Sequence, residues 1–246
     1  MIVANGTSDD EAGGRQPPAL PGKGSGNGGS LLSNNALLAG AGGFLDGFTY
    51  VGHGHVFANA MTGNVVLLGI NCFAGSWSIA FQHLVPIFAF LLGISAARAL
   101  QLRPLQQRLG DPYIAALGLE MGILFVLVLL PQSTPDPAIT TSIAFAASVQ
   151  VETFREVNGH RYNSTFVTGN LRTLSEAAFD WCFGGRSREP ARIVMDFSII
   201  CIAFLVGATA GGYATGRIGN RALWIEFAAL AMVAIRVRPR RRDAHG

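Results

Sequence analysis

Long apolar stretches fill the chain from residue 31 onward, whereas residues 1–30 show no apolar period. A helix needs about 20 mostly apolar residues to cross a bilayer. Five segments are long and apolar enough: 31–51, 79–100, 113–130, 193–215 and 222–237. A sixth segment, 138–151, is shorter, but its flanks extend it toward the same length. We therefore expect an all-α membrane fold with about six transmembrane helices.

Two further segments are ambiguous by hydropathy. Residues 56–73 carry no charge, whereas residues 163–183 contain Arg172, Glu176 and Asp180. Within 163–183, apolar side chains recur at helical spacing on one stripe, with the three charged residues elsewhere, which predicts a helix. The stripe consists of Val167, Leu171, Leu174, Ala178 and Cys182.

The chain divides into three parts. Residues 1–30 are rich in Gly, Pro and Ser and predict a flexible tail, because such a sequence cannot bury apolar surface. Residues 31–237 form a single membrane domain, and residues 238–246 form a short basic tail. The composition fits this division, since 50% of the residues are hydrophobic, 13% are charged and the mean hydropathy is +0.37. A soluble domain carries about 25% charged residues, so the bilayer is the expected solvent.

An internal repeat organises the membrane domain. The stretch Met61-Thr62-Gly63-Asn64 recurs 106 positions later as Val167-Thr168-Gly169-Asn170. The same offset pairs Asp46 with Glu152 and Glu120 with Glu226. Matched acidic and motif positions at one offset predict two equivalent halves, residues 31–131 and 137–237.

The placement of Lys and Arg separates two topologies, because short cytoplasmic loops are enriched in these residues. If neither ambiguous segment crosses, six spans form two inverted halves of three, and only Arg217 and Arg221 lie outside when the N-terminus is inside. If both segments cross, eight spans result and Arg172 is left within the bilayer. We therefore predict six spans with both termini in the cytoplasm.

In the six-span topology, the Thr-Gly-Asn segments enter the membrane and return, or lie along its surface. Thr and Asn favour helix starts, and a half-helix directs its free N–H groups and positive dipole end into the protein. Two such half-helices are typical of secondary transporters. The residues expected to line a solute or ion path are Asp46, Asn59, Thr62, Gly63, Asn64, Gln150, Glu152, Thr168, Gly169 and Asn170. The alternative is that they only pack helices together, as Gly207-xxx-Gly211 and Gly212-xxx-Gly216 are expected to do.

Two acids lie inside predicted spans at repeat-equivalent positions. A charged side chain at the bilayer centre costs about 3 kcal/mol on insertion scales, so a buried acid tends to face a cavity, to pair or to stay protonated. Glu120 and Glu226 are therefore candidate acids for coupling to a proton or cation. The alternative for each is a protonated acid that hydrogen-bonds a neighbouring helix.

The remaining motifs do not indicate metal or enzyme chemistry. His53 and His55 resemble a metal-binding pair, but no Cys or carboxylate joins them at the spacing that a zinc site needs. We place both histidines in a solvated loop and expect no bound metal and no cofactor. The chain contains no phosphate-binding loop, nucleophile elbow or HExxH motif, so we do not expect an enzyme.

Two stretches resemble the YoaK-like family of bacterial membrane proteins. The first is Gly43-Phe44-Leu45-Asp46-Gly47-Phe48-Thr49-Tyr50, followed by Val56-Phe57-Ala58-Asn59-Ala60-Met61-Thr62-Gly63-Asn64. The second runs over residues 150–174 and includes Thr165-Phe166-Val167-Thr168-Gly169-Asn170-Leu171-Arg172. The resemblance covers residues 33–237 and implies a six-span protein of the bacterial inner membrane, of a kind often taken to be a transporter.

We expect a small-solute or ion transporter with a polar site between two inverted repeats. The alternative is a non-transporting sensor or assembly component that docks a partner through cytoplasmic residues 152–192. The expected partners are the lipid bilayer and an unidentified small solute or ion, with no nucleic acid and with a homo-oligomer left open. The transported solute, the coupling ion and the oligomeric state do not follow from the sequence.

Overall fold

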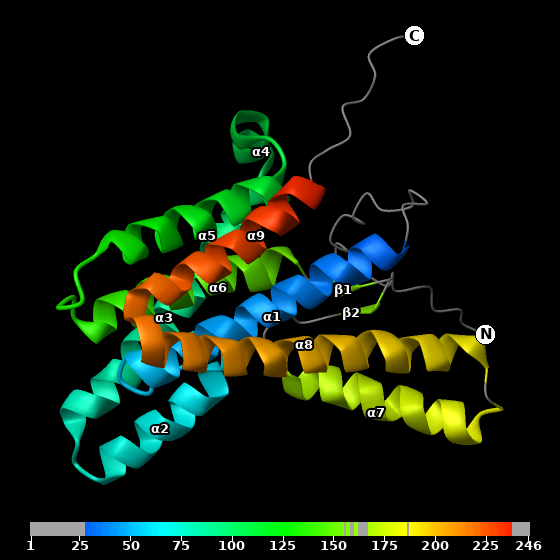
Figure 1. Cartoon of the computed structure of the whole chain (residues 1–246), viewed down its shortest axis with the longest axis horizontal. Helices are drawn as coiled ribbons and strands as arrows, with labels where there is room; N and C mark the ends of the chain where they lie inside the picture. The colour runs from blue at the N-terminus through cyan, green and yellow to red at the C-terminus, as the bar shows by residue number, and fades with distance from the viewer. Residues whose placement is uncertain (1–27, 155, 158–159, 162–166, 186, 238–246) are drawn as a thin grey trace, which may run out of the picture.

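Helices make up nearly all of the part of the chain that the structure describes. A computed structural model describes residues 28–154, 156–157, 160–161, 167–185 and 187–237 (Figure 1). The predicted tails therefore lie almost wholly outside the described residues. The elements, in order, are α1 (Gly28–Gly52), α2 (Met61–Phe73), α3 (Trp77–Leu100), α4 (Arg103–Leu109), α5 (Pro112–Leu129), α6 (Asp136–Thr153), the strands β1 (Glu156–Val157) and β2 (His160–Arg161), α7 (Val167–Phe183), α8 (Arg188–Ile218), the 3-10 helix η1 (Gly219–Ala222) and α9 (Leu223–Val237). The two strands pair antiparallel in a short hairpin.

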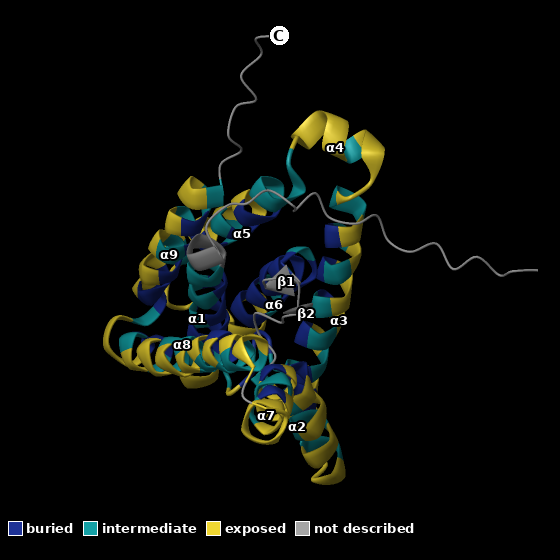
Figure 2. Cartoon of the chain, turned by 90° about the vertical axis from the view of Figure 1, so that its right-hand side faces the viewer, coloured by how far each residue is buried: buried dark blue, intermediate teal, exposed yellow. Residues whose placement is uncertain are grey.

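The helices α1 and α6 form the centre of the bundle (Figure 2). Eleven residues of α6 are buried, from Ile139 to Glu152. Both helices are rich in Gly, Ala, Ser and Thr rather than in large apolar residues. Small residues suit this position, because they let neighbouring backbones approach closely.

Each central helix packs against one long helix of the other half of the chain. The helix α1 packs against α8, and α6 packs against α3. A third contact between the halves joins α5 to α9. At the α1–α8 crossing, a Cβ added to Gly207 would lie 2.7 Å from the carbonyl carbon of Gly40, and one added to Gly211 would lie 2.8 Å from that of Phe44. These glycines therefore allow the two backbones to touch. Gly216 meets no atom within 4 Å, so the packing role predicted for it is wrong.

The helices α2 and α7 begin at repeat-equivalent residues, Met61 and Val167, as the recurrence predicted. They lie nearly end to end, start near the middle of the molecule and run outward in opposite directions (Figures 1 and 2). The apolar stripe of α7 does not coincide with its buried face, because Leu171 is 49% exposed, whereas Asn170 and Ala177 are buried. An outward apolar face is favourable in lipid, so apolar spacing alone does not identify the inner face.

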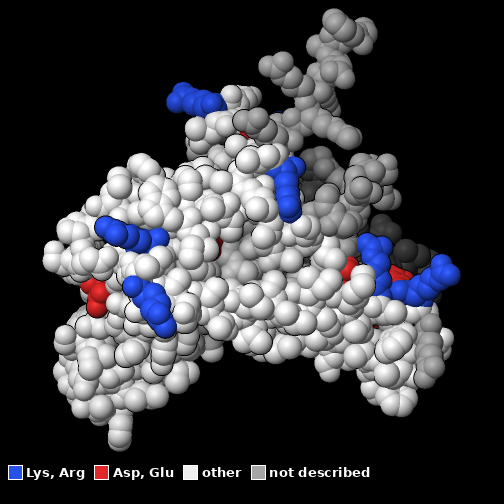
Figure 3. Space-filling model, viewed as in Figure 1, with Lys and Arg blue, Asp and Glu red and all other residues white. Residues whose placement is uncertain are grey.

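Three stretches among the described residues are long and apolar enough to span a membrane: Trp77–Leu100, Pro112–Leu129 and Arg188–Val237, which contains α8, η1 and α9. The visible face carries its charged side chains near the two ends of the long axis and toward the top, with a wide uncharged surface between them (Figure 3). Long apolar helices that expose uncharged surface are what a bilayer requires. The chain is an all-α membrane protein.

Candidate functional site

The chain turns back toward the middle of the fold between α1 and α2. Gly54 and His55 adopt positive φ values of 72° and 57°, which reverse the backbone after α1. The returning loop then lies against α1, where the backbone N–H of Asn59 donates to the Asp46 carboxylate over 2.7 Å. The Asn59 amide also donates to the carbonyl of Gly42 over 3.0 Å. Asp46 and Gly42 are six and ten residues from the end of α1, so the loop that leads into α2 lies about 9–15 Å inside that end.

Asn64 of the first motif holds the loop rather than facing a ligand. Its Oδ1 accepts from the Phe57 backbone N–H over 2.9 Å, and its Nδ2 donates to the Phe57 carbonyl over 2.7 Å. Gly63 provides room for the Phe57 ring, because a Cβ there would lie 2.9 Å from the ring carbons. The motif thus satisfies backbone groups of a non-helical loop, which membrane interiors demand.

A cavity of about 370 Å³ lies where the starts of α2 and α7 meet α1 and α8. It brings together Thr62 and Thr168, the threonines of the two motifs, with Asp46 of α1. The remaining lining residues are Gly47, Tyr50, Val51, Phe57, Ala60, Val167, Phe204 and Ala208. The two repeat-equivalent motifs therefore contribute to one shared site.

Asp46 is the one acid among the described residues of the cavity wall. It is 5% exposed, and besides Asn59 it takes backbone hydrogen bonds from Ala58 and Ala60. Its carboxylate is thus oriented by the loop that leads into α2. A carboxylate held by N–H donors at a helix start is stabilised both by the bonds and by the helix dipole.

The other residues expected along the path are not among the described residues that line the cavity. Asn170 is 4% exposed and Gln150 is 1% exposed. The amide of Gln150 donates to the carbonyl of Leu38 over 3.3 Å, which ties α6 to α1. Glu152 is 7% exposed and lies 3.4 Å from the Arg98 guanidinium. Gly169 has open space where a Cβ would stand.

Glu120 and Glu226 come together on the opposite side of α1 from the cavity. They lie on the packed helices α5 and α9, are 0% and 1% exposed, and are close enough for their charges to interact. Both oxygens of Glu120 and one of Glu226 have no hydrogen-bond partner among the described residues. Two carboxyls inside an apolar cluster cannot both be ionised unless a cation binds between them. Without a cation, at least one of them holds a proton.

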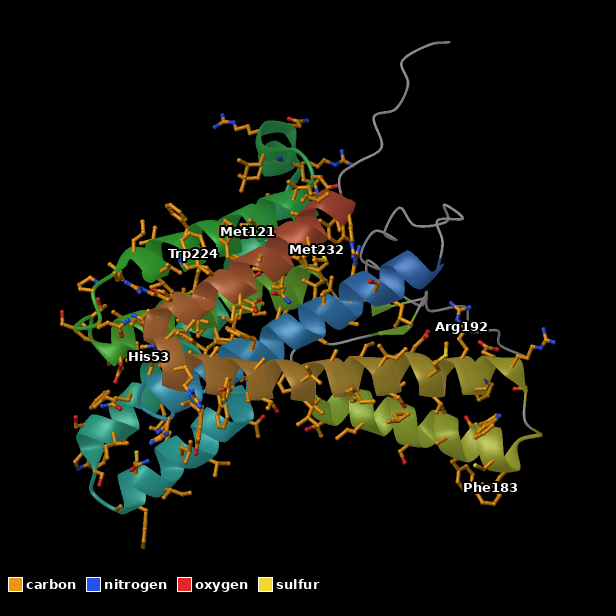
Figure 4. All side chains as sticks on the ribbon, in the orientation of Figure 1. His53, Met121, Phe183, Arg192, Trp224 and Met232 are labelled. Atoms are coloured by element: carbon orange, nitrogen blue, oxygen red, sulfur yellow. The ribbon has the colours of Figure 1, made fainter. Side chains whose placement is uncertain are left out.

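His53 is not solvated as expected. It is 7% exposed, and its Nδ1 lies 2.8 Å from the carboxylate of Asp136 at the start of α6. It stands near the opposite end of the long axis from Arg192 and Phe183 (Figure 4). Among the described residues, no group of three or more His, Cys, Asp or Glu side chains is placed to hold a metal ion.

Sequence reasoning missed the aromatic and apolar part of the wall. The rings of Tyr50 and Phe57 stack with centroids 4.7 Å apart beside the cavity. Phe204 and Ala208 face it from α8. Apolar residues inside a membrane segment carry no signal that separates a lipid contact from a ligand contact. The signal available for these two residues was their spacing. Phe204 and Ala208 are four residues apart, as Gly207 and Gly211 are.

Comparison with known proteins places this fold in a family. Residues 35–236 match the family described as "Protein of unknown function (DUF1275)". The chain is also similar to the UPF0700 transmembrane protein YoaK of Bacillus subtilis (strain 168), with 26% identity over 200 residues that cover 80% of this chain and 88% of the Bacillus protein. No solved structure matches the chain. The match covers most of both chains, and we conclude that this protein belongs to the DUF1275 family of YoaK-like membrane proteins.

Proposed function

We propose that six helices, α1, α3, α5, α6, α8 and α9, cross the bacterial inner membrane as two inverted repeats. In this arrangement α2 and α7 are half-helices that start at mid-depth and run to opposite surfaces. The hydrogen bonds from Asn59 to Asp46 and Gly42 support this depth for α2. For α7, support comes from Thr168 sharing the cavity with Phe204, which lies about halfway along α8.

Equivalent helix contacts support the inverted repeat. An exchange of the halves converts the α1–α8 pair into the α6–α3 pair, and both pairs are in contact. Gly207 of α8 packs on Gly40 of α1. Gly93 is its counterpart, because Leu91-Leu92-Gly93 matches Leu205-Val206-Gly207 in the second half once a gap is allowed. Gly93 packs on Phe145 and Ser148 of α6, the turn that the offset of 106 makes equivalent to Gly40. A matched glycine contact in each pair is what a pseudo-two-fold axis within the membrane would produce.

The shortage of apolar residues in α1 and α6 is compatible with six spans. Their 25 and 18 residues correspond to lengths of about 37 and 27 Å. Both helices are surrounded by protein and need little apolar surface of their own. The N- and C-termini would face the cytoplasm, because this orientation leaves only Arg217 and Arg221 in short outer loops.

Within this architecture, the protein acts as a transporter of a small solute or ion. The observation that carries the proposal is the shared cavity, in which the threonines of both motifs meet at the starts of two half-helices. Secondary transporters place their sites between repeats at such discontinuous helices. Rocking of the two halves around the cavity would open it to either side in turn.

Glu120 and Glu226 are the proposed coupling acids. Both carboxyls are buried, and both oxygens of Glu120 and one of Glu226 lack a hydrogen-bond partner among the described residues, which gives the pair a reason to bind a proton or a cation. The α1 helix lies between this pair and the cavity, with Asp46 on the cavity side and Phe48 in the apolar cluster around α5 and α9. Movement of α1 would therefore affect both sites.

Proteoliposomes loaded with a pH-sensitive dye test this function. Classes of small solutes, such as sugars, alcohols, amines and amino acids, are added one at a time outside. We expect one class to change the internal pH, and we expect Glu120→Gln to abolish that response. Exposed Glu176→Gln on α7 is the matched control. Correctly inserted protein that moves neither solute nor proton for any class would contradict the proposal.

The non-transporting alternative predicts a soluble partner bound to residues 152–192. Within the described part of that region, α7 packs along α8 and contributes to the cavity wall. This region is therefore integrated into the membrane domain. Recovery of a stoichiometric partner together with transport-inactive proteoliposomes would favour the alternative.

A further inference from the structure

The cavity wall indicates the chemical class of the ligand. Five of the lining side chains are large and apolar or aromatic: Tyr50, Val51, Phe57, Val167 and Phe204. The polar groups are the hydroxyls of Thr62, Thr168 and Tyr50 and the carboxylate of Asp46. Among the residues that the structure describes, no Lys or Arg lines the cavity. The nearest basic side chain on α7, Arg172, is already bonded to Glu176 over 2.8 Å.

The Asp46 carboxyl, the one acid among the described lining residues, offers no free charge to a ligand. It is buried and lies against the loop that leads into α2, where the positive end of a helix offsets negative charge. That carboxylate is already engaged by the loop N–H groups, with the shortest bond at 2.7 Å from Asn59. An ion of either sign would bring a charge with no free counter-charge. Within a bilayer such an uncompensated charge is unfavourable.

The size and shape of the cavity restrict the ligand further. A volume of about 370 Å³ falls within the range of about 300–1,000 Å³ that is typical of small-molecule sites. The stacked Tyr50 and Phe57 rings offer a flat apolar wall, and Gly63 beneath Phe57 keeps that wall in place. The threonine hydroxyls can each donate and accept a hydrogen bond.

We propose that this cavity binds a small uncharged solute with a flat apolar body and one hydrogen-bonding end. The apolar body lies against the Tyr50–Phe57 wall, and the polar end bonds to the Thr62 and Thr168 hydroxyls. This inference rests on the proposed transport function, because it identifies the class of solute for the same site. It also excludes inorganic ions as the cargo of this cavity and leaves ion binding to the Glu120–Glu226 pair.

Three probes of one shape and different charge test the proposal: 4-fluorobenzyl alcohol, 4-fluorobenzylamine (a cation at neutral pH) and 4-fluorobenzoate. Binding to the purified full chain in detergent is measured by fluorine NMR line broadening. We expect the alcohol to bind at least tenfold more tightly than either charged probe. Tighter binding of the amine would mean that Asp46 acts as a free counter-charge, and tighter binding of the benzoate would mean that the helix starts dominate. Either result overturns the proposal.

A pair of variants separates cavity binding from partition into detergent. Thr62→Phe places a ring in the cavity, and we expect the alcohol signal to be lost. Val65→Phe adds the same ring on the exposed side of α2, away from the cavity wall, and should leave binding unchanged. Equal binding by both variants and the unmodified chain overturns the proposal. Because binding in detergent needs neither transport nor sidedness, its failure is distinguishable from inactivity in proteoliposomes.

Discussion

Substitution of Gly207 by Ala should destabilise the protein, because this residue is the closest contact between α1 and α8. The added Cβ would lie 2.7 Å from the carbonyl carbon of Gly40 and 2.9 Å from its Cα. Carbon atoms pack at about 3.5–4.0 Å, so the two helices must separate by about 1 Å. Overpacking of this kind costs about 1–3 kcal/mol, and Ala recovers up to about 1 kcal/mol through its higher helix propensity. We expect a net loss of about 1–2 kcal/mol in the free energy of unfolding.

Gly216→Ala on the same helix is the matched control. Nothing lies within 4 Å of a Cβ at this position, so only the propensity gain applies. We expect this variant to be unchanged or more stable by up to about 1 kcal/mol. Unfolding of both variants is followed by titration with sodium dodecyl sulfate in mixed micelles. If Gly207→Ala proves as stable as Gly216→Ala, the close contact between α1 and α8 is refuted.

Three further substitutions test the site. Asn64→Ala leaves the N–H and carbonyl of Phe57 without partners and should lower the free energy of unfolding by about 1–3 kcal/mol in the same titration. Asn71→Ala on α2 loses only a bond to its own helix and should cost less. Equal costs would contradict the role of Asn64 in holding the loop. Asp46→Asn keeps an oxygen for the Asn59 N–H but cannot carry a charge. We expect this variant to fold and insert into the membrane but to take up no solute. Unchanged uptake would remove Asp46 from the mechanism. Glu226→Gln should abolish coupled proton movement without loss of stability, because the neutral amide avoids a buried charge; retained coupling would exclude this acid.

The sequence predicted the helices well because the bilayer imposes a simple rule on length and apolarity. The sixth segment, 138–151, is the core of α6, and the Thr-Gly-Asn recurrence predicted the first residues of α2 and α7. The equivalence of Glu120 and Glu226 also followed from the repeat. Their contact across α5 and α9 did not, because an offset in sequence contains no distance in space.

The cavity could not be derived in advance, because its wall combines four helices from both halves of the chain. Hydropathy does not distinguish Phe204, which faces the cavity, from Leu205, which is 65% exposed. The polar residues misled in a different way. Asn59 and Asn64 were expected to face a ligand, but their amides bond to the backbone of Gly42 and Phe57. Backbone N–H and C=O groups of a buried loop need hydrogen-bond partners, and a list of polar residues does not show which side chains provide them.

Cysteine labelling tests the two half-helices most directly. Cys72, Cys182 and Cys201 are replaced by Ser, and one cysteine is introduced either at Ala74, after α2, or at Ser187, before α8. Both positions are exposed. Intact cells are then treated with a maleimide that does not cross the inner membrane.

If α2 and α7 start at mid-depth and return to opposite surfaces, the cysteine at 74 is labelled in intact cells. The cysteine at 187 is labelled only after the cells are opened. If both helices cross the membrane instead, positions 74 and 187 lie on the same, cytoplasmic side and both are protected. Protection of position 74 in intact cells, with labelling after opening, would contradict the inverted half-helices.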